Sequence, residues 1–369
     1  MKNTLIFGNV NTKDFGAWVT GSQTYSAPER DIEIVSVPGR NGDLIIDNGK
    51  WNNIEVSYPA FIQSNFDDNM SALRSAMCRQ LGYQRLEDSY HPEEFRLGTF
   101  VDGIYPDMRQ RNESGEFTLR FNCKPQRFLK SGEEPIQIMP VHVIGTELSS
   151  QFVPVLGDLS FTVRCATSDT LSIDVTTYDE NIDEIDTTTY SCENGDQITH
   201  SFENTDKYWV ISITGQSSIS TTSLRIQTVT EYNGEALPID AIMCRNFSLL
   251  NPTGYVSKPL IEVYGATLGA MTIENINATG ETESRYIFNI TNTGKQHFYM
   301  DCDMQYVYSD DKTNLTDKLF LTTMESDVGQ GLVFPDLGTN QINFQTYFTT
   351  GASSNGIGLV LIYPRWWKL

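Results

Sequence analysis

Short runs of strand-forming residues, separated by turn formers, constrain the fold of this chain most strongly. Runs rich in Val, Ile, Thr, Phe and Tyr alternate with Gly, Asn, Asp and Pro along almost the whole sequence. Branched and aromatic side chains pack well on a pleated surface, whereas the intervening residues favour turns. The pattern therefore predicts a mainly β protein. The clearest predicted strands are residues 31–37, 54–58, 116–122, 159–165, 208–214, 260–264 and 358–363.

One segment follows a helical period instead. Apolar residues recur every three or four positions from Met70 to Leu81, which places them on one face of a helix. Asp67 and Asp68 precede this run, and Gly82 follows it. We therefore expect a single amphipathic helix with an acidic cap and a glycine stop.

Changes in composition divide the chain into three segments. A basic stretch gives way to a long acidic one around residue 135, and glycines, prolines and a more even charge return after about residue 245. Boundaries of this kind usually lie in exposed connections between domains. We predict an N-terminal domain at 1–135, a middle β domain at 145–240 and a C-terminal domain at 245–369, to which residues 136–144 could contribute.

Acidic residues greatly outnumber basic ones. The chain has 47 Asp and Glu against 26 Lys and Arg, a net charge of −21 and a pI near 4.5. Phosphate binding needs clustered Lys and Arg, so we do not expect nucleic acid as a specific binding partner. If many copies are held together, the acidity must be offset by basic partner faces, by cations or by distance.

The cysteines and the N-terminus indicate a reducing compartment. Six cysteines lack CxxC spacing and an adjacent histidine, so we expect no zinc site and predict free, mostly buried thiols. The N-terminal MKNTLIFGNV lacks the long apolar region and cleavage site of a signal peptide, and no apolar stretch is long enough to span a bilayer. We therefore expect synthesis and folding in a cytosol.

Common catalytic and cofactor motifs are missing from the sequence. There is no GxSxG, P-loop or GxGxxG, and each of His91, His142, His200 and His297 stands alone, without HExxH or HxH spacing. We interpret these histidines as surface or strand residues, with a metal or triad role as the alternative. A pair of carboxylates for glycoside hydrolysis is a further alternative that no particular residues support. We predict no enzyme activity and no cofactor.

Two features of the middle segment allow a binding role. The acidic run Asp179–Asp186 can hold Ca²⁺ in principle, but it lacks the glycine and spacing of an EF-hand loop, which favours a solvated acidic loop. Aromatic faces bury the C–H groups of sugars. The candidate glycan-binding residues are Tyr178, Tyr190, Tyr208 and Trp209, and ordinary core packing is the alternative because alternation can point Trp209 inward as easily as outward.

Five segments resemble the distal tail proteins of siphophages, which are bacteriophages with long non-contractile tails. The most specific is VPGRNGDL at Val37–Leu44, within a run that begins at Asp31. The resemblance covers about residues 1–140 and 245–369. The other segments are GYQRLEDSYHPEEFRLG at 82–98, FTLRFNCKPQRFLKSGE at 117–133, NPTGYVSKPLIEVYG at 251–265 and YPRWWKL at 363–369.

The resemblance implies a structural role in the virion, at the distal end of the phage tail. Family members have an N-terminal split β-barrel-like domain with one helix, and these domains join into a homohexameric ring. The ring lies between the tail tube protein and the tail-associated hub protein, and DNA passes through its lumen. A C-terminal galectin-like β-sandwich often docks receptor-binding proteins. No lectin motif is recognisable in residues 245–369, so the resemblance implies no sugar site there.

Two segments of the resemblance are candidate subunit contacts. Pro38-Gly39 and Asn41-Gly42 are turn formers, so the chain should reverse tightly and hold Arg40 outward. Arg40 can then pair with a carboxylate of a neighbouring subunit or make a local surface contact. At the C-terminus, Trp366 and Trp367 either anchor the chain end in a core or, with Arg365, form an intersubunit contact.

The middle segment departs from the simplest members of the family. There, CKPQRFLKSGE leads almost directly into NPT, whereas here about one hundred residues intervene. Loops accept insertions readily, so we interpret 145–240 as an inserted β-sandwich domain. Larger family members carry carbohydrate-binding-like modules. The alternative function is therefore adhesion to host cell-wall glycan through the insert.

Overall fold

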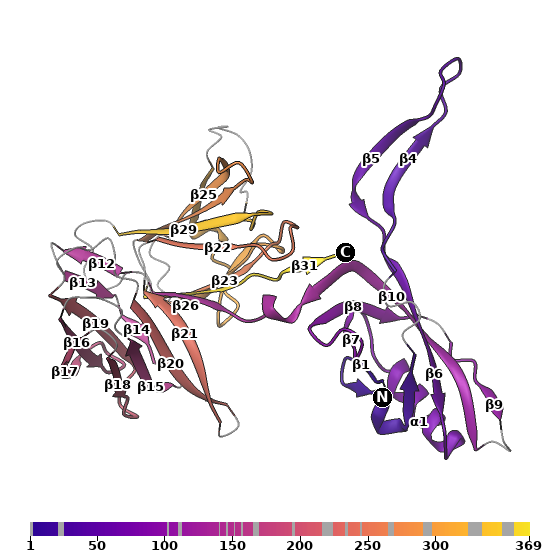
Figure 1. Cartoon of the computed structure of the whole chain (residues 1–369), viewed down its shortest axis with the longest axis horizontal. Coiled ribbons are helices and arrows are strands. Elements are labelled where there is room, and N and C mark those ends of the chain that lie inside the picture. Colours follow the sequence, from indigo (N-terminus) through magenta and orange to yellow (C-terminus); the bar gives the residue numbers. More distant parts are fainter. Residues whose placement is uncertain are drawn as a thin grey trace. The chain divides into compact units, whose positions relative to one another are not determined.

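A computed structural model describes most of the chain as two compact units (Figure 1). Unit 1 comprises Met1–Gly132 and Trp366–Leu369, and unit 2 comprises Glu133–Arg365. Nearly all regular elements are strands, so the prediction of a mainly β fold is confirmed. The described residues are 3–20, 26–101, 103–109, 113–139, 141–144, 147–150, 152–155, 158–164, 170–193, 196–215, 224–232, 235–243, 246–264, 269–290, 297–323, 334–348 and 358–369.

Unit 1 is built on a curled nine-stranded sheet in the order β2-β1-β7-β8-β10-β6-β3, with β9 and β31 also paired to β10. The central strand β10 pairs with β6 along its first half and with β8 along its second, across an irregularity between Cys123 and Arg127. The elements are β1 (Leu5–Phe7), β2 (Val10–Asn11), η1 (Thr12–Phe15), β3 (Ala17–Val19), β6 (Ile54–Ile62), α1 (Phe66–Cys78), β7 (Gln84–Asp88), β8 (Glu94–Phe100), β9 (Asp107–Arg109), β10 (Ser114–Leu129), η2 (Lys130–Gly132) and β31 (Trp367–Lys368).

The core of unit 1 follows from the two periods that the sequence displays. Every second residue of β6 is buried, and these side chains meet the buried residues of β10 and of α1. The helix buries Phe66, Met70, Leu73 and Met77. Among the rings that fill this core, Phe7 and Phe121 lie 5.0 Å apart. Strand and helix thus share one apolar cluster.

The predicted boundaries of the helix were wrong at both ends. The helix ends at Cys78, and Leu81 is 82% exposed rather than on the buried face. The backbone N–H of Gln80 already bonds to Met77 as a turn, which takes the chain out of helical geometry before Leu81. At the start, Asn65 is the N-cap residue, and Asp67 and Asp68 lie in the first turn, where the helix dipole favours carboxylates.

The chain end returns to unit 1. Strand β31 pairs with β10, with Trp367 opposite Phe128 and Lys368 opposite Arg127. Trp366 is only 5% exposed, and its carbonyl accepts the N–H of Leu129 at 2.9 Å. The C-terminal segment is therefore an integral strand of this sheet.

Unit 2 contains three larger sheets. Their orders are β18-β15-β20-β21-β11-β30-β23-β26-β27, β12-β13-β19-β16-β17 with β14 on β19, and β22-β29-β24-β25-β28. The strands are β11 (Ile136–Met139), β12 (Val141–Ile144), β13 (Glu147–Ser150), β14 (Val153–Pro154), β15 (Asp158–Arg164), β16 (Leu171–Tyr178), β17 (Glu184–Cys192), β18 (Gln197–Ser201), β19 (Tyr208–Thr214), β20 (Leu224–Tyr232), β21 (Glu235–Met243), β22 (Asn246–Leu250), β23 (Leu260–Tyr264), β24 (Gly269–Ile276), β25 (Thr282–Ile290), β26 (His297–Asp301), β27 (Tyr306–Ser309), β28 (Leu319–Thr323), β29 (Gln341–Phe348) and β30 (Leu359–Tyr363), with η3 (Thr316–Lys318) before β28.

The middle segment shares a sheet and a core with the strands that follow it. Strand β21 pairs in parallel with β11, which in turn pairs with β30. The cluster around Trp209 also includes Leu359 and Leu361 of β30. Residues 145–240 are thus continuous with the neighbouring strands through hydrogen bonds and apolar packing.

The cysteines differ from the prediction of six free thiols. Cys123 and Cys302 are free and buried, and Cys78 is free but exposed. Cys192, however, is in a disulfide, so the prediction was wrong for this residue. Sequence spacing does not show which cysteines the sheets bring together, and this is why the bond was missed.

Among the helices of the described residues, none is long and apolar enough to cross a membrane.

Replacing the buried C-terminal tryptophan should destabilise unit 1. We expect Trp366→Ala to lower the unfolding free energy by about 3–5 kcal/mol because it leaves a cavity in a packed sheet. Trp367→Ala, at a half-buried neighbouring position, should cost less. Calorimetry and urea unfolding measure both. Equal, small losses for the two variants would contradict the anchoring role of Trp366.

Candidate functional site

A two-stranded ribbon is the most unusual surface of unit 1. Within the described part of the chain, strands β4 (Arg30–Val35) and β5 (Leu44–Trp51) pair only with each other. Figure 1 shows the ribbon extending away from the rest of the unit. Gly39 and Gly42 have φ angles of 81° and 85°, a region that favours glycine, and the N–H of Arg40 bonds to the carbonyl of Val37 at 3.2 Å. The VPGRNGDL segment thus forms the reversal at the ribbon tip.

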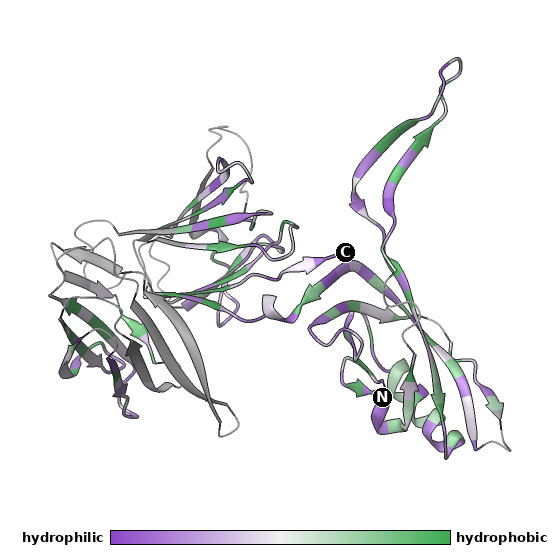
Figure 2. Cartoon of the chain, in the orientation of Figure 1, coloured by the Kyte–Doolittle hydropathy of each residue, from purple (hydrophilic) through white to green (hydrophobic). Residues whose placement is uncertain are grey.

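Both faces of this ribbon expose apolar side chains. The register places Ile34 opposite Ile45 on one face, where they are 60% and 64% exposed. On the other face, Leu44 and Ile46 are each 42% exposed. Figure 2 shows hydrophobic positions along both strands. The ribbon cannot bury these residues, because two strands enclose no core.

The base of the ribbon is held by charged pairs. The Arg30 guanidinium lies 2.7 Å from the Asp47 carboxylate and 4.9 Å from the centre of the Trp51 ring. Hydrogen bonding from Arg30 lowers the pKa of Asp47, and hydrogen bonding from Lys50 lowers the pKa of Asp31. These ion pairs hold the base of the ribbon in place. The apolar side chains farther along the ribbon stay exposed and can contact another surface.

An isolated ribbon of this kind is a candidate binding element. Two-stranded hairpins are marginally stable alone in water, and exposed apolar edge strands promote association with another chain. Contiguous exposed apolar residues mark interaction sites. The arrangement therefore fits a docking surface for another protein.

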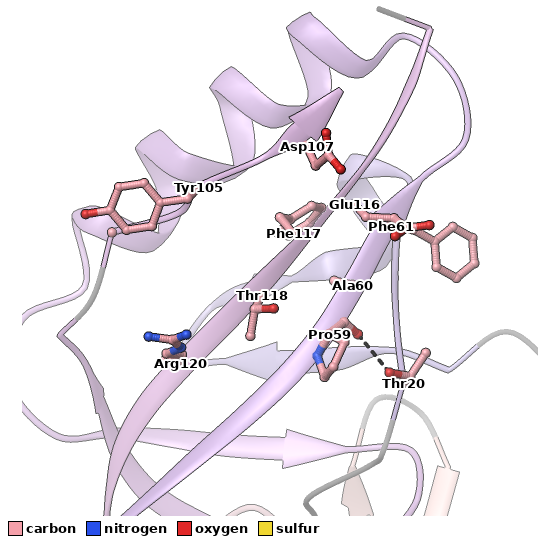
Figure 3. A pocket seen from close by; sticks show the side chains of 11 residues that line it. Thr20, Pro59, Ala60, Phe61, Tyr105, Asp107, Glu116, Phe117, Thr118 and Arg120 are labelled. Carbon is pink, nitrogen blue, oxygen red and sulfur yellow. Dashed lines mark hydrogen bonds between the residues drawn. The ribbon is translucent and has the colours of Figure 1, made fainter. Parts of the chain in front are cut away.

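A pocket of about 540 Å³ lies elsewhere on unit 1 (Figure 3). Strands β6 and β10 form its floor, and residues around β9 line its side. Apolar groups such as Phe61 and Tyr105 stand beside the charged Asp107, Glu116 and Arg120. Its described lining includes no histidine, cysteine or serine. The pocket thus offers a mixed apolar and polar contact surface.

The net charge is distributed very unequally between the two units. Unit 1 has 16 of the 26 basic residues and 17 of the 47 acidic ones, a net charge of −1. The remaining 10 basic and 30 acidic residues give unit 2 a net charge of −20. Copies of unit 1 can therefore approach one another with little electrostatic repulsion.

The structure separates the four predicted subunit-contact residues. Arg40 is exposed at the ribbon tip, where an external contact is possible. Arg365 instead forms a two-pronged ion pair with Asp301, with distances of 2.9 and 3.0 Å. Trp366 is buried, and Trp367 is half-buried in β31. The contacts of Trp366 within the chain favour the alternative that it anchors the chain end in a core, and Arg365 is paired within the chain while its side chain stays 33% exposed.

The predicted glycan-binding aromatics do not form one exposed surface. Trp209 is 0% exposed in an apolar cluster, so its assignment to a sugar-stacking surface was wrong. The alternation in β19 points it inward. Tyr178 and Tyr208 are half-buried and opposite each other on β16 and β19. Tyr190, also half-buried, hydrogen-bonds His200 at 3.0 Å.

The sequence analysis missed a polar cluster on β23 and β26. The buried carboxylate of Glu262 accepts hydrogen bonds from Tyr264 at 2.6 Å and from Tyr363 at 3.0 Å. His297 lies between Glu262 and Asp310, at 2.7 and 2.8 Å. The alternation of Glu262 with Tyr264 along a strand was a visible signal. The partnership with His297 was not, because it depends on strand pairing.

Electrostatics favour the charged forms in this cluster. Burial alone lowers the pKa of His297, but the hydrogen bonds to Glu262 and Asp310 outweigh it and raise the pKa overall. Burial raises the pKa of Glu262, but the hydrogen bonds from His297, Tyr264 and Tyr363 outweigh burial and lower this pKa overall. Both ring nitrogens of His297 face carboxylates, which fits a doubly protonated imidazolium.

No group of three or more potential metal ligands is found among the described residues. In the acidic run of the middle segment, Glu180, Asp183, Glu184 and Asp186 are exposed. Asp179 uses its carboxylate to accept the N–H groups of Asn181 and Asp183 at 2.8 and 2.9 Å. This carboxylate orders its own turn.

Comparison with family models and with curated proteins finds no match for this chain.

Hydrogen exchange should distinguish the ribbon from the sheet behind it. In the monomeric chain, we expect the amides of β4 and β5 to exchange much faster than those of β6 and β10, because no core protects the ribbon. Exchange followed by mass spectrometry reports each segment. Protection of the ribbon equal to that of β10 in a strict monomer would contradict this description.

The His297 cluster should make stability depend on pH. The pKa of His297 is higher in the folded chain than in the unfolded chain, so protonated His297 stabilises the fold. This contribution to stability is complete below the unfolded pKa of about 6.5 and is lost as the pH rises through the folded pKa. We expect His297→Gln to be more destabilising at pH 5 than at pH 8.5 in urea unfolding.

His200 supplies a control of opposite sign. Burial lowers its pKa, so the stability that it contributes is lost as pH falls, and His200→Gln should cost least at low pH. Parallel pH profiles for the two variants would contradict both assignments.

Proposed function

We propose that this protein is a structural ring component at the distal end of a bacteriophage tail. The observation that carries the proposal is the exposed apolar ribbon β4–β5, whose tip is the VPGRNGDL segment that resembles the distal tail proteins. Apolar residues on both faces of a two-stranded ribbon favour association with another protein surface. In this proposal the chain acts by assembly and not by catalysis.

The ribbon and the pocket of unit 1 are different surfaces of one chain. When a surface of one copy binds a different surface of the next, the contact is heterologous, and repeated contacts close into a ring or extend as a filament. We place the ribbon of one copy against the β6–β10 face of its neighbour. The apolar Phe61 and Tyr105 would receive isoleucines, and the pocket's acidic residues would face Arg40.

The charge distribution supports the same arrangement. Ring contacts through the nearly neutral unit 1 keep the units of net charge −20 out of the interface. Repulsion between the acidic units acts over about 10 Å at 0.1 M salt, so moderate ionic strength should promote assembly. An acidic surface would also repel the phosphates of DNA that passes the ring.

The remaining partners follow from the same resemblance. The ring would join the tail tube protein to the tail-associated hub protein within the virion. Unit 2 would provide the surface that docks receptor-binding proteins. Six-fold symmetry is the expected stoichiometry.

Polar substitution of the ribbon tests the proposal. We expect the full chain to form rings, visible by electron microscopy and mass photometry, and Ile34→Lys with Ile45→Asp, which places opposite charges across from each other, to remain monomeric. Both positions are exposed, so the free energy of unfolding should change by less than about 0.5 kcal/mol.

Leu81→Asp is the matched control, because Leu81 is 82% exposed and lies outside the ribbon. This variant should assemble normally. The measurements should span low to moderate salt. A wild-type chain that stays monomeric throughout, or a double variant that assembles as well as wild type, would overturn the proposal.

A further inference from the structure

A row of aromatic side chains crosses one face of the nine-stranded sheet in unit 2. Strands β23, β26 and β27 are neighbours, and their register places Tyr264 opposite His297 and Tyr299 opposite Tyr308. The alternate residues of these strands, including Val263, Phe298 and Val307, are buried. The aromatic residues are half-buried. The row therefore lies on the face opposite to those buried side chains.

The rings of this row contact one another in sequence. Tyr264 stacks on His297 at 4.1 Å between ring centres, and Tyr299 follows at 4.7 Å from His297. Tyr308 stacks on Tyr299 at 5.1 Å, and Tyr306 stacks on Tyr308 at 5.7 Å. The result is a continuous aromatic platform across three strands, defined here as Tyr264, His297, Tyr299, Tyr306 and Tyr308. Its Tyr264 end packs against the Trp209 cluster, so Tyr299, Tyr306 and Tyr308 form the part that a ligand can reach.

Polar contacts hold this platform in one arrangement. Glu262 and Asp310 fix the two nitrogens of His297, and Glu262 also fixes the hydroxyl of Tyr264. At the rim, the ammonium of Lys312 lies 4.6 Å from the centre of the Tyr308 ring. Rings held in place before binding lose little conformational entropy when a ligand arrives.

We propose that the aromatic platform binds a neutral or amino-bearing oligosaccharide. Because the rings stack on one another, they offer mainly their edges and hydroxyls to a ligand. The ring edges can contact the C–H groups of a sugar, and the hydroxyls, together with the 63% exposed carboxylate of Asp310, hydrogen-bond sugar hydroxyl or amino groups. The net charge of −20 in unit 2 disfavours polyanions such as nucleic acids and phosphorylated or sulfated polymers.

A saccharide fits this surface better than a protein partner does. Protein interfaces bury an apolar centre that is depleted of charged residues. The platform instead consists of aromatic side chains with polar tips, and it encloses Glu262 and borders Asp310 and Lys312. The site does not depend on ring assembly, since one chain contains all of it.

A glycan array tests the proposal with the full chain. The array carries neutral hexose polymers, N-acetylhexosamine oligomers, glucosamine oligomers with free amines, and sulfated and phosphorylated polymers. We expect binding to a neutral or amino-bearing member. For the best binder, Tyr308→Ala and Tyr299→Ala should each weaken affinity about tenfold, which corresponds to about 1.4 kcal/mol.

Two controls keep the result interpretable. Tyr308→Phe retains the ring and should bind within about threefold of wild type, a difference of less than about 1 kcal/mol, while unfolding curves verify that each variant is folded. Tyr83→Ala removes a tyrosine that is 47% exposed in unit 1 and should not alter binding. Failure to bind any saccharide, preference for the polyanions, or undiminished binding by a folded Tyr308→Ala would overturn the proposal. None of these outcomes bears on ring formation.

Discussion

Backbone pairing along β10 is the interaction on which the rest of unit 1 depends. This single strand bonds to β6, β8, β9 and β31, so it joins the early strands of the chain to its last residues. The alternation along β10 then directs Phe117, Leu119 and Phe121 into one core. The ribbon β4–β5 lies outside this network, which is why its apolar residues stay exposed.

Whether a second layer covers the apolar side chains explains both the buried core of unit 1 and the exposed ribbon. Apolar side chains leave water wherever a second layer covers them. Helix α1 covers the residues of β6, whereas Ile34 and Ile45 stay exposed among the described residues of unit 1. The proposed neighbour in a ring would supply the missing layer. The concentration of charge in unit 2 leaves unit 1 free to make that contact.

In unit 2, the hydrogen bonds of one buried carboxylate both stabilise its charge and orient neighbouring aromatic rings. Glu262 is 6% exposed yet accepts three hydrogen bonds, which compensate for removing its charge from water. The same bonds orient the rings of Tyr264 and His297 at one end of the aromatic platform. A network that stabilises the sheet therefore also prepares a surface for recognition.

The sequence by itself determined the mainly β class, the position of the helix and the turn at the ribbon tip, because these depend on local periodicity and on glycine. It did not determine the ends of the helix, the burial of Trp209 and Trp366, or the disulfide at Cys192. Alternation shows that residues share a face, but only strand pairing and layer packing decide which face is covered. For the same reason Arg365 and His297 acquired their carboxylate partners, Asp301, Glu262 and Asp310, only in the tertiary structure.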